Sequence, residues 1–295
     1  GGTSQNYPSY GAMIAGYYGP VSHPHGLPTY IKMNKIEGDG AAWMGQKYMG
    51  YEASRQGVGD LQLKMGKDRF MGRKDLLDLV EKHSAIKGQG ESWREFQSQA
   101  VTAITGKAAE TFRIEEDSKY DTFKDDQLGK DALAAVRAIQ NGAKFVNIQY
   151  GGWDMHSGIV NALNSRQVTL DRYIGLLMDE LQARDLFENT LLVVATEFGR
   201  TPKINGNAGR DHWSGSVPLM FAGGGYDLGR VIGTSNANAE VPEDGECGPL
   251  DLRWTVLNHM GIQRNNTWMS IQGRPMPVTT NEEKNILTDI SVGVG

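Results

Sequence analysis

The chain has 295 residues, enough to bury the core of one large α/β domain, although two smaller domains would also fit this length. Its net charge of −5 excludes broad electrostatic attraction to nucleic acid or to an anionic membrane surface. The single cysteine, Cys247, excludes an intrachain disulfide and a metal site built from several thiolates. The sequence has no apolar run of about eighteen residues, so we expect no membrane insertion.

The first half of the chain predicts helices joined by loops. Residues 1–60 are rich in Gly, Pro, Tyr and Ser, which predicts a loop-rich surface segment with one short helix from Ser9 to Tyr18. Apolar residues at three- and four-residue steps, or a capping-box start, predict further helices over 74–83, 92–107 and 127–140. The charged stretch 113–126 predicts an exposed connection.

The second half predicts a strand, a long helix and another strand. The apolar runs 145–150 and 190–196 are typical of strands buried on both faces. An apolar stripe between them predicts a helix from Ser157 to about Asp185. This order is a βαβ unit, whose crossover is right-handed. We also expect a strand over 217–222 and a helix that runs from Asp251, as its N-cap, to Gly261.

Metal-compatible side chains follow the two predicted strands. Asp154 and His156 come just after the first strand, and Glu197 just after the second. His212, with Asp211 beside it, lies in the next loop. Ligands bind outside the carboxyl ends of the strands in an open parallel sheet, so we expect these side chains to meet in one crevice. Carboxylate and imidazole donors suit a divalent ion, zinc or manganese first, with iron and calcium as further candidates.

Each part of this constellation also has a structural explanation. An isolated Asp-x-His is common, Arg200 could neutralise Glu197 in a buried ion pair, and Arg210 with Asp211 could form a salt-bridged turn. Arg200 and Arg210 are equally suited to bind phosphate or sulfate, because a planar guanidinium matches two oxygens at once. The sequence contains no phosphate-binding loop G-x-x-x-x-G-K-[ST], no H-E-x-x-H and no G-x-S-x-G.

The motifs around these residues resemble a known family. They are Gly151-Gly-Trp-Asp-Met-His156, Thr196-Glu-Phe-Gly-Arg-Thr201, Gly209-Arg-Asp-His-Trp213, Ala222-Gly-Gly-Gly225 and Asp251-Leu252 with its helix. Together they look like the ordered motifs of the domain-of-unknown-function family 1501, in the alkaline phosphatase-like superfamily that also holds the sulfatases. The likeness is most specific over 127–261, which would be the core of the metal site.

The resemblance implies a three-layer α/β/α sandwich with a mostly parallel central sheet and a two-metal site. One metal would be held by Asp154, His156 and His212. Glu197 matches an acidic ligand of the second metal, while Phe198 stands where relatives commonly have a His. The resemblance also implies export to the periplasm and an N-terminal part with a first strand and a nucleophile. We therefore expect residues 1–295 to be a single domain that is incomplete at its N-terminus.

These observations lead us to expect a metal-dependent hydrolase of phosphate or sulfate esters, in which Arg200 and Arg210 stabilise developing charge. We expect its substrate to be a small anionic ester, and an ester group on a polysaccharide is one alternative. We expect no nucleic acid partner. One alternative is a non-catalytic binding or structural protein that keeps the scaffold with an incomplete site. Another is a metal-dependent isomerase or transferase of the phosphoglycerate mutase kind. The oligomeric state is not predicted.

Overall fold

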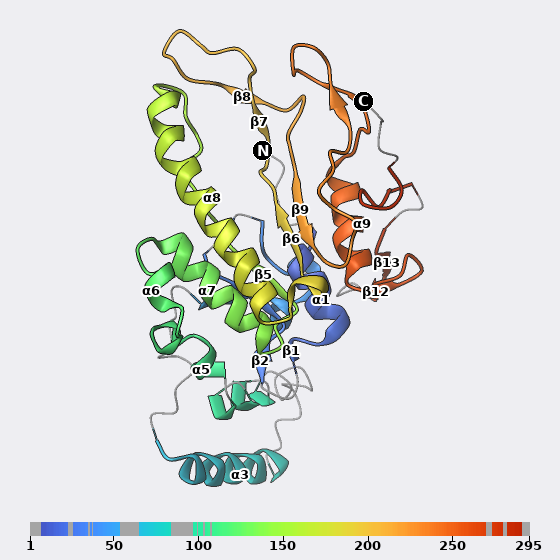
Figure 1. The fold of residues 1–295 in the computed structure, drawn as a ribbon. Coiled ribbons are helices and arrows are strands. Elements are labelled where there is room, and N and C mark those ends of the chain that lie inside the picture. The colour runs from blue at the N-terminus through green and yellow to red at the C-terminus, as the bar shows by residue number, and fades with distance from the viewer. Residues whose placement is uncertain are drawn as a thin grey trace. The chain divides into compact units, whose positions relative to one another are not determined.

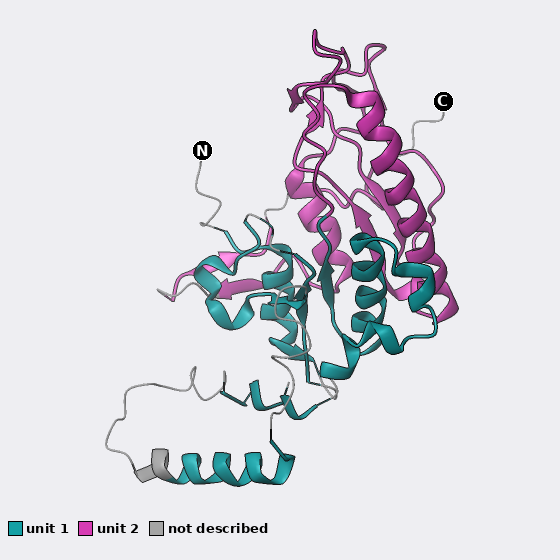
Figure 2. Ribbon diagram, turned by 90° about the vertical axis from the view of Figure 1, so that its left-hand side faces the viewer, with its two compact units in different colours: residues 1–149 teal, residues 150–295 magenta. Residues whose placement is uncertain are grey.

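The computed structural model describes residues 7–22, 26–34, 36, 38–53, 65–83, 97–98, 100–102, 104–106, 108–269, 273–279 and 282–290. The described residues form a mixed α/β protein with several small sheets, one of them parallel (Figure 1). The chain divides into two compact units, residues 1–149 and residues 150–295 (Figure 2). Among the described helices, none is both long enough and apolar enough to cross a membrane.

The first unit is built on a three-stranded parallel sheet in the order β4–β3–β5. Its strands are β3 (Tyr30–Lys32), β4 (Tyr51–Glu52) and β5 (Phe145–Asn147). Ile31 lies at the centre, opposite Tyr51 on one side and Val146 on the other, and its side chain is fully buried. This central strand therefore anchors the core of the unit.

Two helices confirm the sequence-based predictions for this unit. Helix α1 (Tyr10–Tyr18) starts at its N-cap Ser9, whose hydroxyl accepts a hydrogen bond from the Ala12 amide. Helix α7 (Gln127–Gln140) has the predicted bounds and ends at Asn141. Its Ala134, Ala135 and Ala138 belong to the core cluster that also contains Leu27, Ile31 and Met33. Small side chains on this face let the helix approach the apolar core closely.

Residues 1–60, predicted as a loop-rich surface segment, also contain buried strands. The segment contains β3 and β4, the hairpin β1 (Val21–Ser22) and β2 (Leu27–Pro28), and the short helices η1 (Ala42–Met44) and η2 (Gln46–Tyr48). Leu27 is fully buried, and so is most of Lys32, whose ammonium lies 2.8 Å from Asp39. Strands of two or three residues are too short to display an alternating pattern, and a buried lysine further hides it.

Other helices of this unit with described bounds are α3 (Lys67–His83), α5 (Ala108–Thr111), η4 (Ile114–Glu116) and α6 (Tyr120–Phe123). Helix α3 confirms the predicted helix over 74–83 and begins earlier. The predicted helix start at Ser92 lies outside the described residues. The stretch 113–126 is more than an exposed connection, because Phe123 is fully buried and Asp117 pairs with Arg137 at 2.9 Å.

One buried carboxylate of α7 lies among amide donors. Asp131 is 4 % exposed, and its two oxygens accept hydrogen bonds from Asn34 Nδ2 at 3.2 Å and Gln127 Nε2 at 2.8 Å. Burial raises the pKa of Asp131 to about 6, against the opposing effect of these two hydrogen bonds. The folded state therefore retains this proton at a pH where an exposed aspartate has lost it.

The second unit begins with the long helix α8 (Ile159–Ala183). Its apolar stripe is confirmed, because Tyr173, Leu177 and Leu181 are buried. After η5 (Phe187–Asn189), strand β6 (Leu191–Val194) pairs antiparallel with β9 (Met220–Gly223). In the described part of the chain, β5 and β6 belong to different sheets, so the predicted βαβ unit is not formed.

The predicted burial of β5 and β6 on both faces is also wrong. Every residue of the two strands is half-buried. Each strand has one hydrogen-bonded neighbour within the described residues: β3 for β5, and β9 for β6. A run of Leu and Val shows that a strand is apolar, but it does not show how many neighbours the strand has.

Three two-stranded ribbons and one helix complete this unit. The ribbons are β7 (Gly199–Arg200) with β8 (His212–Trp213), β10 (Thr234–Ser235) with β11 (Pro242–Asp244), and β12 (Thr267–Met269) with β13 (Pro275–Pro277). Helix α9 (Pro249–His259) starts earlier than predicted, with Gly248 as its N-cap. Asp251 is therefore not the N-cap. Its carboxylate accepts the Gly248 amide at 2.7 Å, as in the second half of a capping box.

A buried carboxylate ties the C-terminal segment to α9. Glu283 is 5 % exposed, and its Oε1 lies 3.0 Å from Arg253 Nη2. Arg264 lies 3.9 Å from the other oxygen, and its guanidinium stacks 4.2 Å from the centre of the Trp254 ring. Two guanidinium groups thus compensate one buried negative charge.

Candidate metal site

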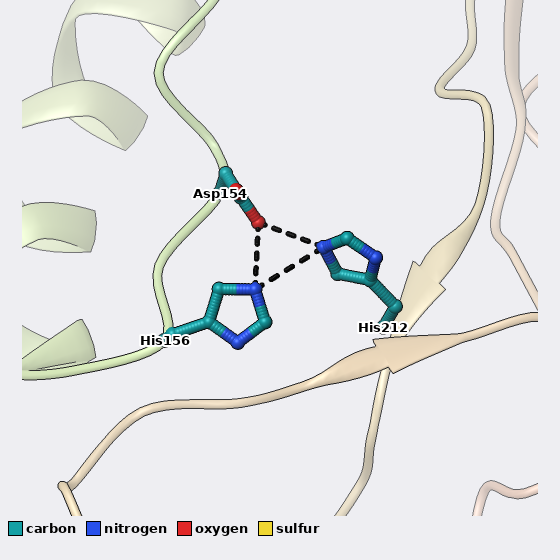
Figure 3. A group of neighbouring side chains, drawn as sticks. All are labelled: Asp154, His156 and His212. Carbon is teal, nitrogen blue, oxygen red and sulfur yellow. Dashed lines mark hydrogen bonds and ion pairs between the residues drawn. The ribbon is translucent and has the colours of Figure 1, made fainter.

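Three side chains of the second unit converge on one point (Figure 3). Oδ1 of Asp154 lies 3.0 Å from Nε2 of His156 and 2.9 Å from Nε2 of His212. The two Nε2 atoms are 3.2 Å apart. One carboxylate oxygen and two imidazole nitrogens therefore form a nearly equilateral triangle.

The chemistry and spacing of this triangle fit a divalent metal ion. One carboxylate and two imidazoles are a common donor set for zinc, and they suit manganese and iron as well. A tetrahedral zinc ion with bonds of about 2.0–2.1 Å holds its ligand atoms about 3.3 Å apart. The three observed separations lie within 0.4 Å of that value. All three side chains are also about half exposed or more, so an ion could enter from solvent.

The β7–β8 ribbon positions His212. Its register places Arg200 directly opposite His212, so both side chains leave the same face of the ribbon. The Phe198 ring lies against the imidazole of His212, with the ring centres 4.4 Å apart. Gly199 leaves room for this arrangement, because a Cβ there would overlap the carbonyl oxygen of Ser216.

The loop before α8 positions Asp154 and His156. Between them Met155 is buried, and its carbonyl accepts the amide of Arg210 at 3.0 Å. Gly209, the residue before Arg210, passes so close to the main chain of His156 that a Cβ would overlap it. The loop carrying two of the ligands and the strand approaching the third are therefore held together through the main chain.

Arg200 forms an ion pair with the same oxygen that faces both histidines. Its Nη2 donates to Oδ1 of Asp154, and its Nη1 lies 3.4 Å from Nε2 of His156. The Arg200 guanidinium is the main reason that the pKa of Asp154 lies well below its usual range, followed by the hydrogen bond with His212. Asp154 is thus ionised at neutral pH and can act as an anionic ligand.

Asp211 contacts the other nitrogen of the His156 ring. Its Oδ1 lies 3.0 Å from Nδ1. Hydrogen bonds with His156 first and Asn205 second lower the pKa of Asp211, so the carboxylate is an acceptor at neutral pH. With its proton on Nδ1, His156 donates to this carboxylate and presents a lone pair on Nε2 to a cation.

The other residues predicted for the site have different places. Glu197 is exposed, lies in the bend between β6 and β7, and is not a member of the described metal-compatible group. Arg200 pairs with Asp154 rather than with Glu197. Arg210 contacts this region through its main chain, since its carbonyl accepts from Arg200 Nη1 at 3.2 Å.

Sequence reasoning did not identify two residues that support the site. Phe198, in the resembled motif, packs on His212, and Asn205 donates a hydrogen bond to Asp211 at 3.0 Å. The turn-forming sequence Asn205-Gly-Asn-Ala-Gly209 predicts a tight loop. It gives no indication that the amide of its first residue faces a candidate ligand.

Comparison with protein families gives a match over nearly the whole chain. The family described as "Protein of unknown function (DUF1501)" matches residues 1–290. No curated protein and no solved structure matches the chain.

Proposed function

Because this chain belongs to the DUF1501 family, whose description assigns no activity, we propose its function from the site: a metal-dependent hydrolase of phosphate or sulfate esters. The observation that carries the proposal is the triangle of Asp154, His156 and His212, with ligand atoms 2.9–3.2 Å apart. We propose zinc or manganese as the ion, in keeping with these donors.

The residues of the site would have separate roles. Asp154, His156 and His212 would hold the ion, which when bound supplies a Lewis acid that polarises an ester oxygen and lowers the pKa of bound water. Arg200, 20 % exposed and beside the triangle, would turn a guanidinium edge to the transferred phosphate or sulfate group. Arg210 is the second cation that we assign to the anion.

The family resemblance supports three finer parts of this proposal. They are a three-layer, alkaline phosphatase-like arrangement of the whole protein, a second ion that would use Glu197, and a location in the periplasm. An experimental structure with metal would test the first two. Fractionation of the producing cells would test the third, and recovery in the cytosolic fraction would contradict it.

A second candidate function is a non-catalytic binding protein. The ion pair between Arg200 and Asp154 favours it, because the arginine supplies a positive charge to this carboxylate without a metal. In this version the exposed histidines and Arg200 would recognise an anionic group on a polysaccharide or a partner protein. Measurements of bound metal and of ester hydrolysis distinguish the hydrolase from the binding protein.

The first experiment measures metal in the full chain. The protein is stripped with chelator, reconstituted with zinc or manganese, freed of excess ion and analysed by mass spectrometry. We expect about one ion per chain, with strong losses in His156→Ala and His212→Ala. The matched control is His259→Ala, which removes a histidine of α9 that packs on Tyr226 instead.

Turnover is then measured with p-nitrophenyl phosphate and p-nitrophenyl sulfate. Metal-dependent release of p-nitrophenol that falls in both site variants would support hydrolysis. Bound metal without turnover of any ester, together with saturable binding of phosphate or sulfate, would support the binding role. Absence of metal from the reconstituted wild-type chain would refute the metal-dependent proposal.

A further inference from the structure

We propose that Asn205 is a positioning residue that holds Asp211 on Nδ1 of His156 and so keeps Nε2 of His156 available to a divalent cation. The inference rests on the metal site proposed above and adds a residue outside the triangle. It concerns how Asn205 orients the ligand His156 in the metal-free protein.

The side-chain amide of Asn205 contacts both Asp211 and His156. Its Nδ2 donates to Oδ1 of Asp211 at 3.0 Å and to the main-chain carbonyl of His156 at 3.2 Å. The same Oδ1 of Asp211 lies 3.0 Å from Nδ1 of His156. Asn205 therefore fixes the carboxylate and the main chain of the residue that the carboxylate orients.

Asn205 is itself fixed by the turn that it starts. Its Oδ1 accepts the amides of Asn207 and Gly209, each at 3.0 Å, and its own amide donates to the Gly209 carbonyl at 2.8 Å. The turn is tied to the start of α8, because the amide of Ile159 donates to the Ala208 carbonyl at 2.8 Å. The side-chain amide is thus held from both sides and has little freedom to turn away.

A second turn in the same unit is closed in a similar way, with its main-chain hydrogen bond one residue longer. Asn236 accepts the Glu240 amide on Oδ1 at 2.8 Å, and its own amide donates to the Val241 carbonyl at 2.9 Å. The residue three positions after each asparagine is an alanine with positive φ, 55° at Ala208 and 56° at Ala239.

This comparison separates two roles of the asparagine side chain. In both turns the side-chain oxygen closes the turn. In the first turn the side-chain nitrogen also donates to Asp211 and to His156. The donations toward the site are therefore additional to what the turn requires, and the second turn provides a matched control.

The experiment compares Asn205→Ser with Asn236→Ser in the full, metal-stripped chain. A serine hydroxyl can still close such a turn, though more weakly than an asparagine. It lacks the NH₂ group that donates to Asp211 and to the His156 carbonyl. We expect Asn205→Ser to weaken Zn²⁺ binding in calorimetry by about 10- to 100-fold, the usual effect of losing a partner that orients a metal ligand. Asn236→Ser should bind Zn²⁺ as the wild type does.

Two further readouts distinguish positioning from general damage. In the metal-free protein labelled with ¹⁵N-histidine, wild-type His156 should carry its proton on Nδ1, and Asn205→Ser should populate the other tautomer. In addition, the effects of Asn205→Ser and Asp211→Ala should not multiply in the double variant, because both remove the same hydrogen bond. Equal Zn²⁺ affinity of Asn205→Ser and wild type, or fully multiplicative effects, would overturn the proposal.

The design also separates this inference from the proposed function. If wild-type protein binds no Zn²⁺, the proposed function fails, and the histidine spectrum still tests the positioning role. If the wild type binds Zn²⁺ and Asn205→Ser binds it equally well, the inference alone fails. Should Asn205→Ser not fold, the spectrum of Asp211→Ala, which lacks the acceptor oxygen, decides, and an unchanged His156 tautomer would refute the positioning mechanism.

Discussion

Arg200 and His212 face each other across the β7–β8 ribbon, and both contact the same oxygen of Asp154. One carboxylate oxygen therefore receives a guanidinium and an imidazole from a single rigid face. This arrangement places a guanidinium group next to the candidate ligands.

We expect Arg200→Ala to lower kcat for the active ester by at least about 100-fold, the usual cost of removing a donor that stabilises transition-state charge. Zinc content should be retained, because Arg200 is not one of the three ligands. Arg210→Ala should have a smaller effect, since its contacts with this region are made by the main chain. Steady-state kinetics of the two variants measure these effects. Equal losses of kcat in Arg200→Ala and Arg210→Ala would contradict the larger role that we assign to Arg200.

Gly209→Ala should disrupt the site, because the new Cβ would overlap the main chain of His156. We expect loss of at least about 2 kcal/mol of stability, as for other overpacked buried positions, and weakened zinc binding. The control is Gly206→Ala, in the same turn, where a Cβ would meet no atom within 4 Å. Urea unfolding and calorimetry measure both effects. Wild-type zinc binding in Gly209→Ala would contradict the close approach of Gly209 to the main chain of His156.

Glu283→Gln should destabilise the chain by about 3–5 kcal/mol, because it leaves two partly buried guanidinium groups without their anion. Glu243→Gln changes an exposed carboxylate in β11 and should shift stability by less than about 0.5 kcal/mol. Chemical unfolding at neutral pH compares the two. A similar midpoint for both variants would mean that Glu283 does not anchor the C-terminal segment.

Asp131 predicts a pH dependence of stability. Its pKa is about 6 in the folded protein and near 3.8 when unfolded, so the unfolded chain releases this proton first as pH rises. The contribution of Asp131 to stability is therefore largest below about pH 4, falls between about pH 4 and 6, and is constant above. At 1.36 kcal/mol per pKa unit, the loss is at most about 3 kcal/mol.

Asp131→Asn removes this ionisation. Urea unfolding of the wild type and the variant, followed from pH 4 to 7, should give two curves whose difference changes mainly over that interval. A constant difference between the curves would show that Asp131 titrates alike in both states.

Local patterns predicted the helices well and the sheets poorly. The helix over 127–140 is confirmed at both ends, where the structure shows local contacts, a cap by Asp126 at the start and a stop at Asn141. Strand pairing has no such local signal. The partner of β6 is the antiparallel β9, and the central β3 is a three-residue strand with a buried lysine.

The candidate ligands were found by residue type, although the route that brings them together was not. We expected Asp154, His156 and Glu197 at neighbouring strand ends and His212 in the following loop. His212 instead reaches Asp154 from the β7–β8 ribbon, and Glu197 is not a member of the described group. Asp211 was expected near the candidate ligands, and it lies on Nδ1 of His156. The contribution of Asn205 could not be predicted, because the direction of its side-chain amide depends on contacts with Asp211 and with His156, which is 49 residues away in the chain.

His156 and His212 are 56 residues apart in sequence and 3.2 Å apart at Nε2. Holding them together closes a loop that contains all of α8, β6 and β7. Closing this loop costs conformational entropy, which opposes the approach of the two rings to one ion. An ion bound in this way would act as a removable cross-link within the second unit. Its binding free energy would then add to the stability of the elements it encloses, and chelation would lower the stability of the folded state.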